Sequence, residues 1–275
     1  MRVTTRAETV GRRAADSRPM EVAARLGFVA RGAIYILVGV IALQIAAGRG
    51  GQADRGGALA QIAARSYGTV VLWLLAVGFG GMALWRLSEA AFGATGPDGH
   101  KAGQRLKSLA RGVLYTAFCV STVAFVIGAS SRATANSNKQ SRTLTARVMT
   151  HTGGRLLVGL AGIVIIGVGL YLAYRAWKKK FLRRMDLAGT RPSTRAAVEK
   201  LGVFGGIARG AVAVLAGVFL LVAAIRFQPS KAEGIDGTLR AFAHTPLGPY
   251  LLVLVALGLV AFGLFSWCEA RWRRV

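Results

Sequence analysis

The chain has 275 residues, a formal charge of +25 at pH 7 and a hydrophobic content of 53%. Its mean hydropathy of +0.47 excludes an ordinary soluble domain of this size. The positive charge alone suits either nucleic acid or an anionic membrane, so the placement of the basic residues has to decide between them.

The N-terminal segment and the apolar stretches are assigned by composition. The first twenty residues contain five arginines and no apolar core, so we expect no cleavable signal peptide and a flexible, basic cytoplasmic tail at residues 1–20. A bilayer core about 30 Å thick needs about 20 apolar residues in a helix. The chain is therefore predicted to be an all-α integral membrane protein with six transmembrane helices. Their predicted bounds are Phe28–Ala47, Thr69–Ala91, Leu109–Ala129, Leu156–Ala176, Ile207–Ile225 and Leu247–Cys268.

The basic residues are divided unequally between the two ends of these spans. Of the 36 Lys and Arg, 25 lie in the N-terminal tail, the second and fourth loops and the C-terminus, and 11 lie in the other three loops. Because cytoplasmic loops carry an excess of Lys and Arg, both termini are predicted to be cytoplasmic. The same distribution argues against a nucleic-acid partner, since a DNA-binding protein gathers its basic residues on one folded surface.

Short motifs recur along the chain in step with the spans. An Ala-Arg-Gly motif opens each odd-numbered span, with its arginine at Arg31, Arg111 and Arg209. In the even-numbered spans, a shift of 180 residues superposes Glu89 on Glu269 together with several glycines. A two-helix unit is therefore repeated along the chain.

These repeats predict the domain organisation. Three parallel two-helix hairpins are expected at residues 21–95, 101–178 and 196–275, with a basic cytoplasmic linker at residues 179–195. Parallel repeats are related by an axis along the membrane normal, which favours a pseudo-threefold arrangement of the three hairpins.

The motifs also support a family assignment. The segment "GFVARGAIYILVGVIAL", the three Ala-Arg-Gly copies, and the endings "WRLSEA" and "FSWCEA" resemble the bacterial family called domain of unknown function 1206. The resemblance covers nearly the whole chain as three tandem two-helix units. It implies an integral membrane protein, here expected in the bacterial inner membrane, and it supplies no activity. The middle copy departs from the acidic pattern at Arg175, and the third lacks the repeated tyrosine at Ala213.

Five charged residues form the candidate site. The three arginines lie just inside the cytoplasmic edge of their spans, and the two glutamates close even-numbered spans at the same depth. We expect the arginines to anchor helix ends and to form ion pairs with the glutamates. The alternative is a functional anion or proton site. The five residues are Arg31, Arg111, Arg209, Glu89 and Glu269.

A glycine run enters the fifth span. Gly202, Gly206 and Gly210 follow the small-residue spacing that lets helices approach closely. The partner helix is expected within the same chain, and a second copy of the chain is the alternative.

The fourth loop mixes basic and apolar side chains. Such a segment can lie on the inner leaflet and bind anionic lipid, or it can serve topology alone. Its lipid-facing basic residues are predicted to be Lys178, Lys179, Lys180, Arg183 and Arg184.

The sequence offers no chemistry of an enzyme. It contains no P-loop, zinc-protease or nucleophile-elbow motif, and two histidines, His151 and His244, are too few for a metal site. Span interiors carry neither acidic residues near mid-membrane nor prolines, which argues against a typical transporter. We therefore expect no catalytic residue, no cofactor and no metal.

The most economical function is that of a structural or accessory membrane protein. It is expected to act through helix–helix and anionic-lipid contacts, with a possible membrane-protein partner. The alternative is a channel or transporter for a small or anionic solute that uses a cytoplasmic ring of arginines.

Overall fold

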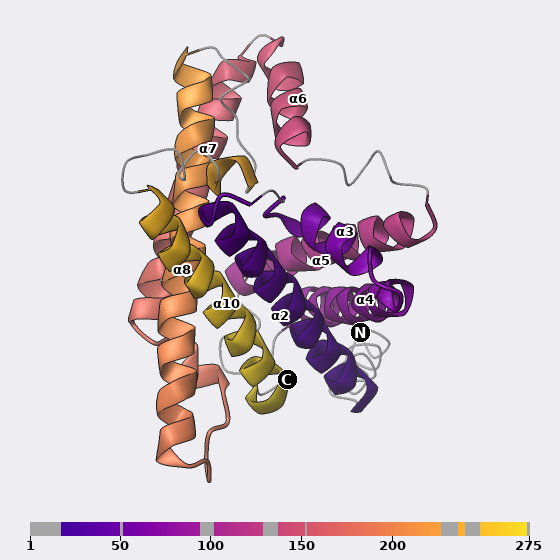
Figure 1. The fold of residues 1–275 in the computed structure, drawn as a ribbon. Coiled ribbons are helices and arrows are strands. Elements are labelled where there is room, and N and C mark those ends of the chain that lie inside the picture. Colours follow the sequence, from indigo (N-terminus) through magenta and orange to yellow (C-terminus); the bar gives the residue numbers. More distant parts are fainter. Residues whose placement is uncertain are drawn as a thin grey trace, which may run out of the picture. The chain divides into compact units, whose positions relative to one another are not determined.

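The computed structural model describes residues 18–49, 52–93, 102–128, 137–151, 153–226, 236–239 and 248–273 (Figure 1). Its six long helices are each long and apolar enough to cross a membrane, which confirms the six predicted spans. They are α2 (Arg18–Ala46), α4 (Gly68–Phe92), α5 (Ala102–Val126), α7 (Gly154–Trp177), α8 (Pro192–Arg226) and α10 (Gly248–Trp272).

Several helix boundaries differ from the predicted ones. Helix α2 begins at Arg18, inside the segment predicted as a flexible tail, and residues 1–17 of that tail lie outside the described residues. Helix α8 has 35 residues and begins at Pro192, inside the segment predicted as a linker. Apolar content locates the part of a helix that lies in lipid, but not the polar turns that continue it into water.

Shorter helices lie between the spans. They are α3 (Arg55–Ala63), α6 (Ser137–Met149) and a 3-10 turn, η1 (Leu182–Arg184). Helix α3 begins after Asp54 because that carboxylate accepts a hydrogen bond from the Gly57 N–H at 2.9 Å, as an N-cap does.

The described residues fall into two compact units, and the division lies within α2, α3 and α10. The first unit comprises the described parts of residues 1–32, 62–133 and 266–275. Helices α4 and α5 run side by side in it (Figure 1). Its core consists of Ala24, Phe28, Met82, Trp85 and Ala270, with Tyr115 packed against it.

The second unit comprises the described parts of residues 33–61 and 134–265. Helices α7 and α8 run side by side in it along much of their length (Figure 1). Met149, Val158 and Ala224 form a small buried cluster near one end of this pair.

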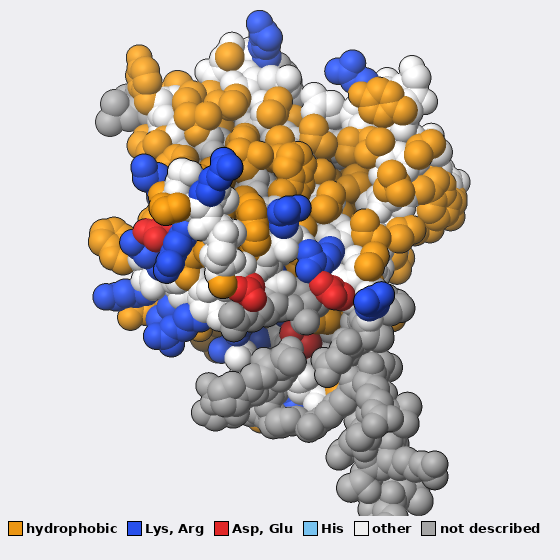
Figure 2. Space-filling view, turned by 90° about the horizontal axis from the view of Figure 1, so that it is seen from below, with side chains coloured by type: hydrophobic (Ala, Val, Ile, Leu, Met, Phe, Trp, Pro, Cys, Tyr) orange, Lys and Arg blue, Asp and Glu red, His pale blue; other side chains and the backbone are white. Residues whose placement is uncertain are grey.

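Large apolar side chains are exposed along the spans. On α7, for example, Leu156 is 69% and Val164 is 62% exposed. Figure 2 shows hydrophobic side chains, in orange, over broad parts of the surface. Apolar surface of this extent needs an apolar solvent, which the hydrocarbon core of a bilayer provides.

Candidate functional site

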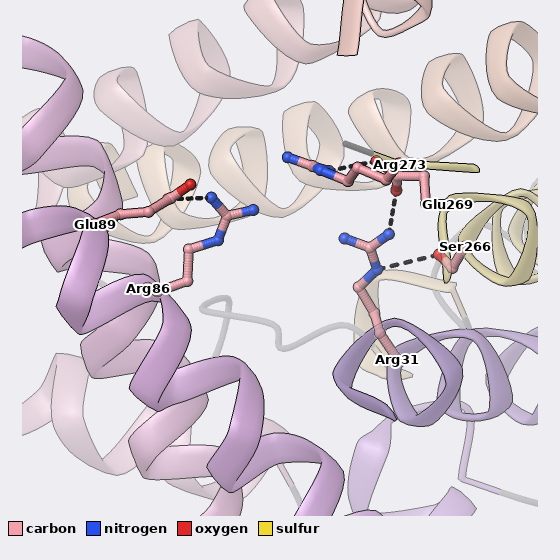
Figure 3. Close-up of polar contacts among 6 residues, drawn as sticks. All are labelled: Arg31, Arg86, Glu89, Ser266, Glu269 and Arg273. Atoms are coloured by element: carbon pink, nitrogen blue, oxygen red, sulfur yellow. Dashed lines mark hydrogen bonds and ion pairs between the residues drawn. The ribbon is translucent and has the colours of Figure 1, made fainter. Parts of the chain in front are cut away.

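Arg31 in α2 is bonded to two side chains of α10. Its Nη2 donates to Glu269 Oε2, and its Nε donates to Ser266 Oγ at 3.1 Å (Figure 3). Arg273 donates to the other oxygen of the same carboxylate. The Glu269 side chain is only 9% exposed, so one buried carboxylate serves two arginines through charge-assisted hydrogen bonds.

Two aromatic rings lie among these guanidinium groups. Phe28 and Trp85 meet edge to face with their centroids 5.7 Å apart. Arg31 and Arg273 lie 4.8 and 4.9 Å from the Phe28 centroid. Arg273 also lies 5.4 Å from the Trp85 centroid. The rings therefore offer cation–π contacts to arginines that have lost most of their water.

Arg86 in α4 forms a second ion pair in the same unit. Its Nη1 donates to Glu89 Oε2 at 2.6 Å, and the hydroxyl of Ser108 in α5 donates to that oxygen at 2.9 Å. The Arg86 guanidinium carbon lies 4.0 Å from the Trp85 centroid. Arg86 is only 4% exposed, and its Nε–H has no hydrogen-bond partner among the described residues.

The five candidate residues are therefore brought together only in part. The structure joins Arg31 to Glu269, whereas Glu89 accepts from Arg86 and Ser108. Arg111 is half-buried and lies close enough to Arg86 to repel its charge. Arg86 was not among the predicted site residues, although its place one turn before Glu89 in an apolar helix was a usable signal.

Arg209 has different neighbours from Arg31. Its guanidinium carbon lies 4.9 Å from the Phe262 ring centroid and 5.9 Å from that of Tyr35. In the part of the chain that the structure describes, no carboxylate is within ion-pairing distance of it. Arg175, which stands where the other copies have Glu89 and Glu269, lies over the ring of Tyr171 at 5.6 Å.

Two further arginines bind the carbonyl ends of neighbouring spans. Arg25 Nη1 donates to the Ala270 and Arg271 oxygens at 2.9 and 3.0 Å. Arg105 donates to the Ala90 and Ala91 oxygens at 2.8 and 2.7 Å. The last carbonyls of a helix lack intrahelical partners and carry partial negative charge. A guanidinium stabilises them both by donating hydrogen bonds and by its positive charge.

These two contacts are equivalent under the repeat. Arg25 and Arg105 each stand six residues before the arginine of an Ala-Arg-Gly motif, and their acceptors are related by the 180-residue shift. The third copy has Val203 at this position. This spacing was the signal that sequence reasoning missed.

At three helix pairs, a small residue of one helix lies close to a backbone carbonyl oxygen of the other. We call these pairs the junctions: α2–α10, α4–α5 and α7–α8. A methyl group added to Gly39 would lie 2.8 Å from the Ala256 oxygen, and one added to Gly217 would lie 2.8 Å from the Gly162 oxygen. At the third junction, Cys119 Sγ donates to the Ala76 oxygen at 3.4 Å. The three residues Gly39, Cys119 and Gly217 each stand eight positions after a repeated arginine, and their partners are related by shifts of 86 and 180 residues.

Contacts within a hairpin repeat as well. A methyl group on Gly27 would lie 2.5 Å from the Met82 Cβ. One on Gly205 would likewise lie 2.7 Å from the Phe262 Cβ. The two partners are related by the 180-residue shift. Small residues are required at these positions because the backbones approach too closely for a side chain.

The glycine run predicted for packing lies against other parts of the same chain. Gly202 faces the rings of Phe181 and Phe265, and Gly206 faces Ala176. A methyl group on Gly210 would lie 2.7 Å from the Gly169 oxygen. Gly206 and Gly210 therefore line the α7–α8 junction, and Gly202 packs against the fourth loop and α10.

The basic residues of the fourth loop are largely open to solvent. Lys178 and Arg183 are exposed, and Arg184 is half-buried. Lys179 pairs with Glu199, with their side chains 51% and 32% exposed, and Lys180 lies 5.0 Å from the Tyr174 ring centroid. These groups are accessible for binding anions.

The described residues hold no group of three or more His, Cys, Asp or Glu side chains placed to bind a metal ion. His151 is exposed, and its Nδ1 lies 2.9 Å from the Arg147 carbonyl oxygen. His244 lies outside the described residues.

Six helices that are long and apolar enough to cross a bilayer, with contacts that repeat along the chain, define an all-α multi-pass membrane protein built from tandem units. The chain belongs to the family described as Domain of Unknown Function (DUF1206), which matches residues 26–93, 106–179 and 204–273. The three matches confirm the tandem repeats.

The chain is similar to the uncharacterized protein YxxB of Bacillus subtilis (strain 168). The two are 28% identical over 244 residues, which cover 88% of this chain and 87% of the relative. No solved structure matches the chain.

Proposed function

We propose that this protein is a structural or accessory component of the bacterial inner membrane that acts through contacts with other helices and with anionic lipid. The use of its arginines as bonds between spans carries the proposal. Arg25, Arg31 and Arg105 each bond a neighbouring span. Arginines held by carboxylates and helix ends act as fixed joints between spans, and a fixed bundle suits a scaffold better than a machine that must change shape.

The proposal includes a pseudo-threefold bundle with both termini in the cytoplasm. Its support is the repetition of contacts: the three junctions use corresponding residues, and so do the two hairpin contacts described above. The division of basic residues supports the orientation. In this orientation the site around Glu269 lies at the inner leaflet.

Anionic lipid is the proposed partner of the fourth loop. The exposed Lys178, Lys180 and Arg183 would lie at the cytoplasmic surface, where each basic residue contributes about 1 kcal/mol to binding an anionic leaflet. A membrane-protein partner would bind the exposed apolar faces of α5 or α7.

Co-purification from native membranes, with mass spectrometry of both proteins and lipids, tests the proposal. We expect anionic lipid and one or more membrane proteins in stoichiometric amounts. Replacing Lys178, Lys179 and Lys180 with Gln should reduce the retained anionic lipid, whereas replacing Arg142 and Arg147 at the opposite loop should not. Equal lipid retention by both variants would contradict the lipid role, and recovery of the chain alone would contradict the accessory role.

The second candidate is a pore or transporter for an anionic solute. It is favoured by the excess of arginine over carboxylate around Trp85 and by the unpartnered Arg86 Nε. Anion flux into proteoliposomes, with Arg86→Gln as the comparison, separates this candidate from the accessory role.

A further inference from the structure

Among the described residues, the polar layer around Trp85 and Phe28 carries more positive than negative charge. Its carboxylates are Glu89 and Glu269, and each is already bonded to at least one arginine. Its guanidinium groups belong to Arg31, Arg86 and Arg273. Buried cations in excess of buried anions are costly unless another anion joins them.

Arg86 is the least satisfied member of this layer. A guanidinium has five N–H donors in a fixed plane. Only Nη1 of Arg86 is bonded to a carboxylate, and its buried Nε has no acceptor among the described residues. A buried charged donor without an acceptor is rare in native proteins and points to a group that the chain itself does not supply.

Arg273 provides a second guanidinium on the same ring. Arg86 and Arg273 lie 4.0 and 5.4 Å from the Trp85 centroid, and Arg273 repels the charge of Arg86. Figure 3 shows the Arg86 side chain pointing toward the group formed by Arg31, Glu269 and Arg273. Arg273 uses Nη1 for Glu269, which leaves other N–H groups of its fork for a further acceptor.

We propose that a phosphate group binds between Arg86 and Arg273 beside Trp85, accepting hydrogen bonds from the Arg86 Nε–H and from the N–H groups of Arg273 that Glu269 does not use. Planar guanidinium donors match the geometry of phosphate oxygens, and a phosphate supplies the missing negative charge. The phosphate belongs either to the headgroup of an anionic phospholipid or to a free phosphate. Only the lipid source rests on the proposed position of this layer at the inner leaflet.

The test uses the full-length protein, purified in detergent and stripped of lipid. One arm measures phosphatidylglycerol binding by native mass spectrometry against phosphatidylcholine, and the other measures inorganic phosphate binding by calorimetry. Arg86→Gln should bind at least about tenfold more weakly, the loss expected for one charge-assisted hydrogen bond. Arg147→Gln, which removes an exposed arginine on α6, outside both the layer and the fourth loop, should bind like the wild type.

The two arms distinguish the sources. Selective binding of phosphatidylglycerol that inorganic phosphate does not displace assigns the site to lipid, and binding of inorganic phosphate with displacement of the lipid assigns it to free phosphate. Wild-type affinities in both Arg86→Gln and Arg273→Gln, or binding of neither ligand by the wild type, would overturn the proposal.

Two measurements remain decisive if Arg86→Gln does not fold. Phosphate should raise the melting temperature of the wild-type protein above that in chloride of equal ionic strength. Arg86→Lys keeps the charge but loses the planar fork, and it should fold yet bind more weakly than the wild type. The proposed lipid role of the fourth loop can fail separately, because replacing Lys178, Lys179 and Lys180 leaves this layer intact.

Discussion

Replacing Glu269 with glutamine should be among the most damaging single changes of a charged side chain in this protein. The carboxylate accepts from Arg31 and from Arg273, and its side chain is 9% exposed. Glutamine has nearly the same shape and keeps one acceptor oxygen. The substitution therefore removes the negative charge while largely preserving the packing.

The size of the effect follows from burial. At about 4 Å and an effective dielectric constant of about 20, each Arg–Glu contact is worth about 4 kcal/mol before desolvation is counted. Removing one member of a buried pair costs about 3–5 kcal/mol, because the charge that remains is buried without compensation. We expect Glu269→Gln to lower the free energy of unfolding by about this amount.

The matched control is Glu199→Gln. Glu199 pairs with Lys179, but those side chains are 32% and 51% exposed, so about 0.2–1 kcal/mol is expected. Unfolding by sodium dodecyl sulfate in mixed micelles, followed by far-UV circular dichroism, measures both variants. Added salt should shrink the Glu199 effect and leave the Glu269 effect nearly unchanged.

A double-mutant cycle with Arg31→Gln isolates the pair. The double variant should be less destabilised than the sum of the single variants, because the stranded charge has gone. If Glu269→Gln costs no more than Glu199→Gln, or if the two substitutions are additive, the carboxylate does not neutralise the arginines as argued above.

Three other outcomes are expected. Gly169→Ala should lower the free energy of unfolding by about 1–3 kcal/mol in the same titration because its methyl group would meet the Gly210 oxygen at 2.8 Å, whereas Gly167→Ala, with open space around it, should be neutral or stabilising. Arg155→Gln should cost about 1–3 kcal/mol because its guanidinium binds the carbonyl end of α8; an unchanged transition would contradict this capping role. In intact cells, an impermeant thiol reagent should label a cysteine at position 139 but not at position 179, and the reverse pattern would contradict the predicted orientation.

The sequence predicts the spans because lipid imposes a simple requirement. About 20 consecutive apolar residues are needed whatever the neighbouring helices are, and each of the six stretches appears as a helix. The ends of α8 and the short helices α3 and α6 were not predicted. They lie where water permits any backbone that satisfies its own hydrogen bonds, so apolar content carries no information about them.

The sequence predicted that Arg31 would pair with a glutamate at its own level, but not which of the two glutamates it would be. The repeat places Glu89 and Glu269 at the same level along the membrane normal, and either could meet Arg31. The choice of Glu269 depends on which helix lies beside α2 at that level, which only the packed structure fixes. The contacts of Arg86 and Arg273 with the Trp85 ring could not be predicted for a related reason, since they depend on which helices meet at that ring.

The bond between Arg31 and Glu269 joins residues 238 positions apart, near the two ends of the chain. At about 5–20 residues per second, a ribosome needs roughly 12–48 s to make the carboxylate after it has made the arginine. The first span must therefore wait in the membrane with its guanidinium held by water or lipid phosphate. The joint cannot form until the last turn of α10 has left the ribosome, so the first span makes this contact only after the sixth span has been synthesised. A chain that stops before Glu269 would leave Arg31 without this carboxylate, and the buried charge is a defect that membrane proteases and chaperones can detect.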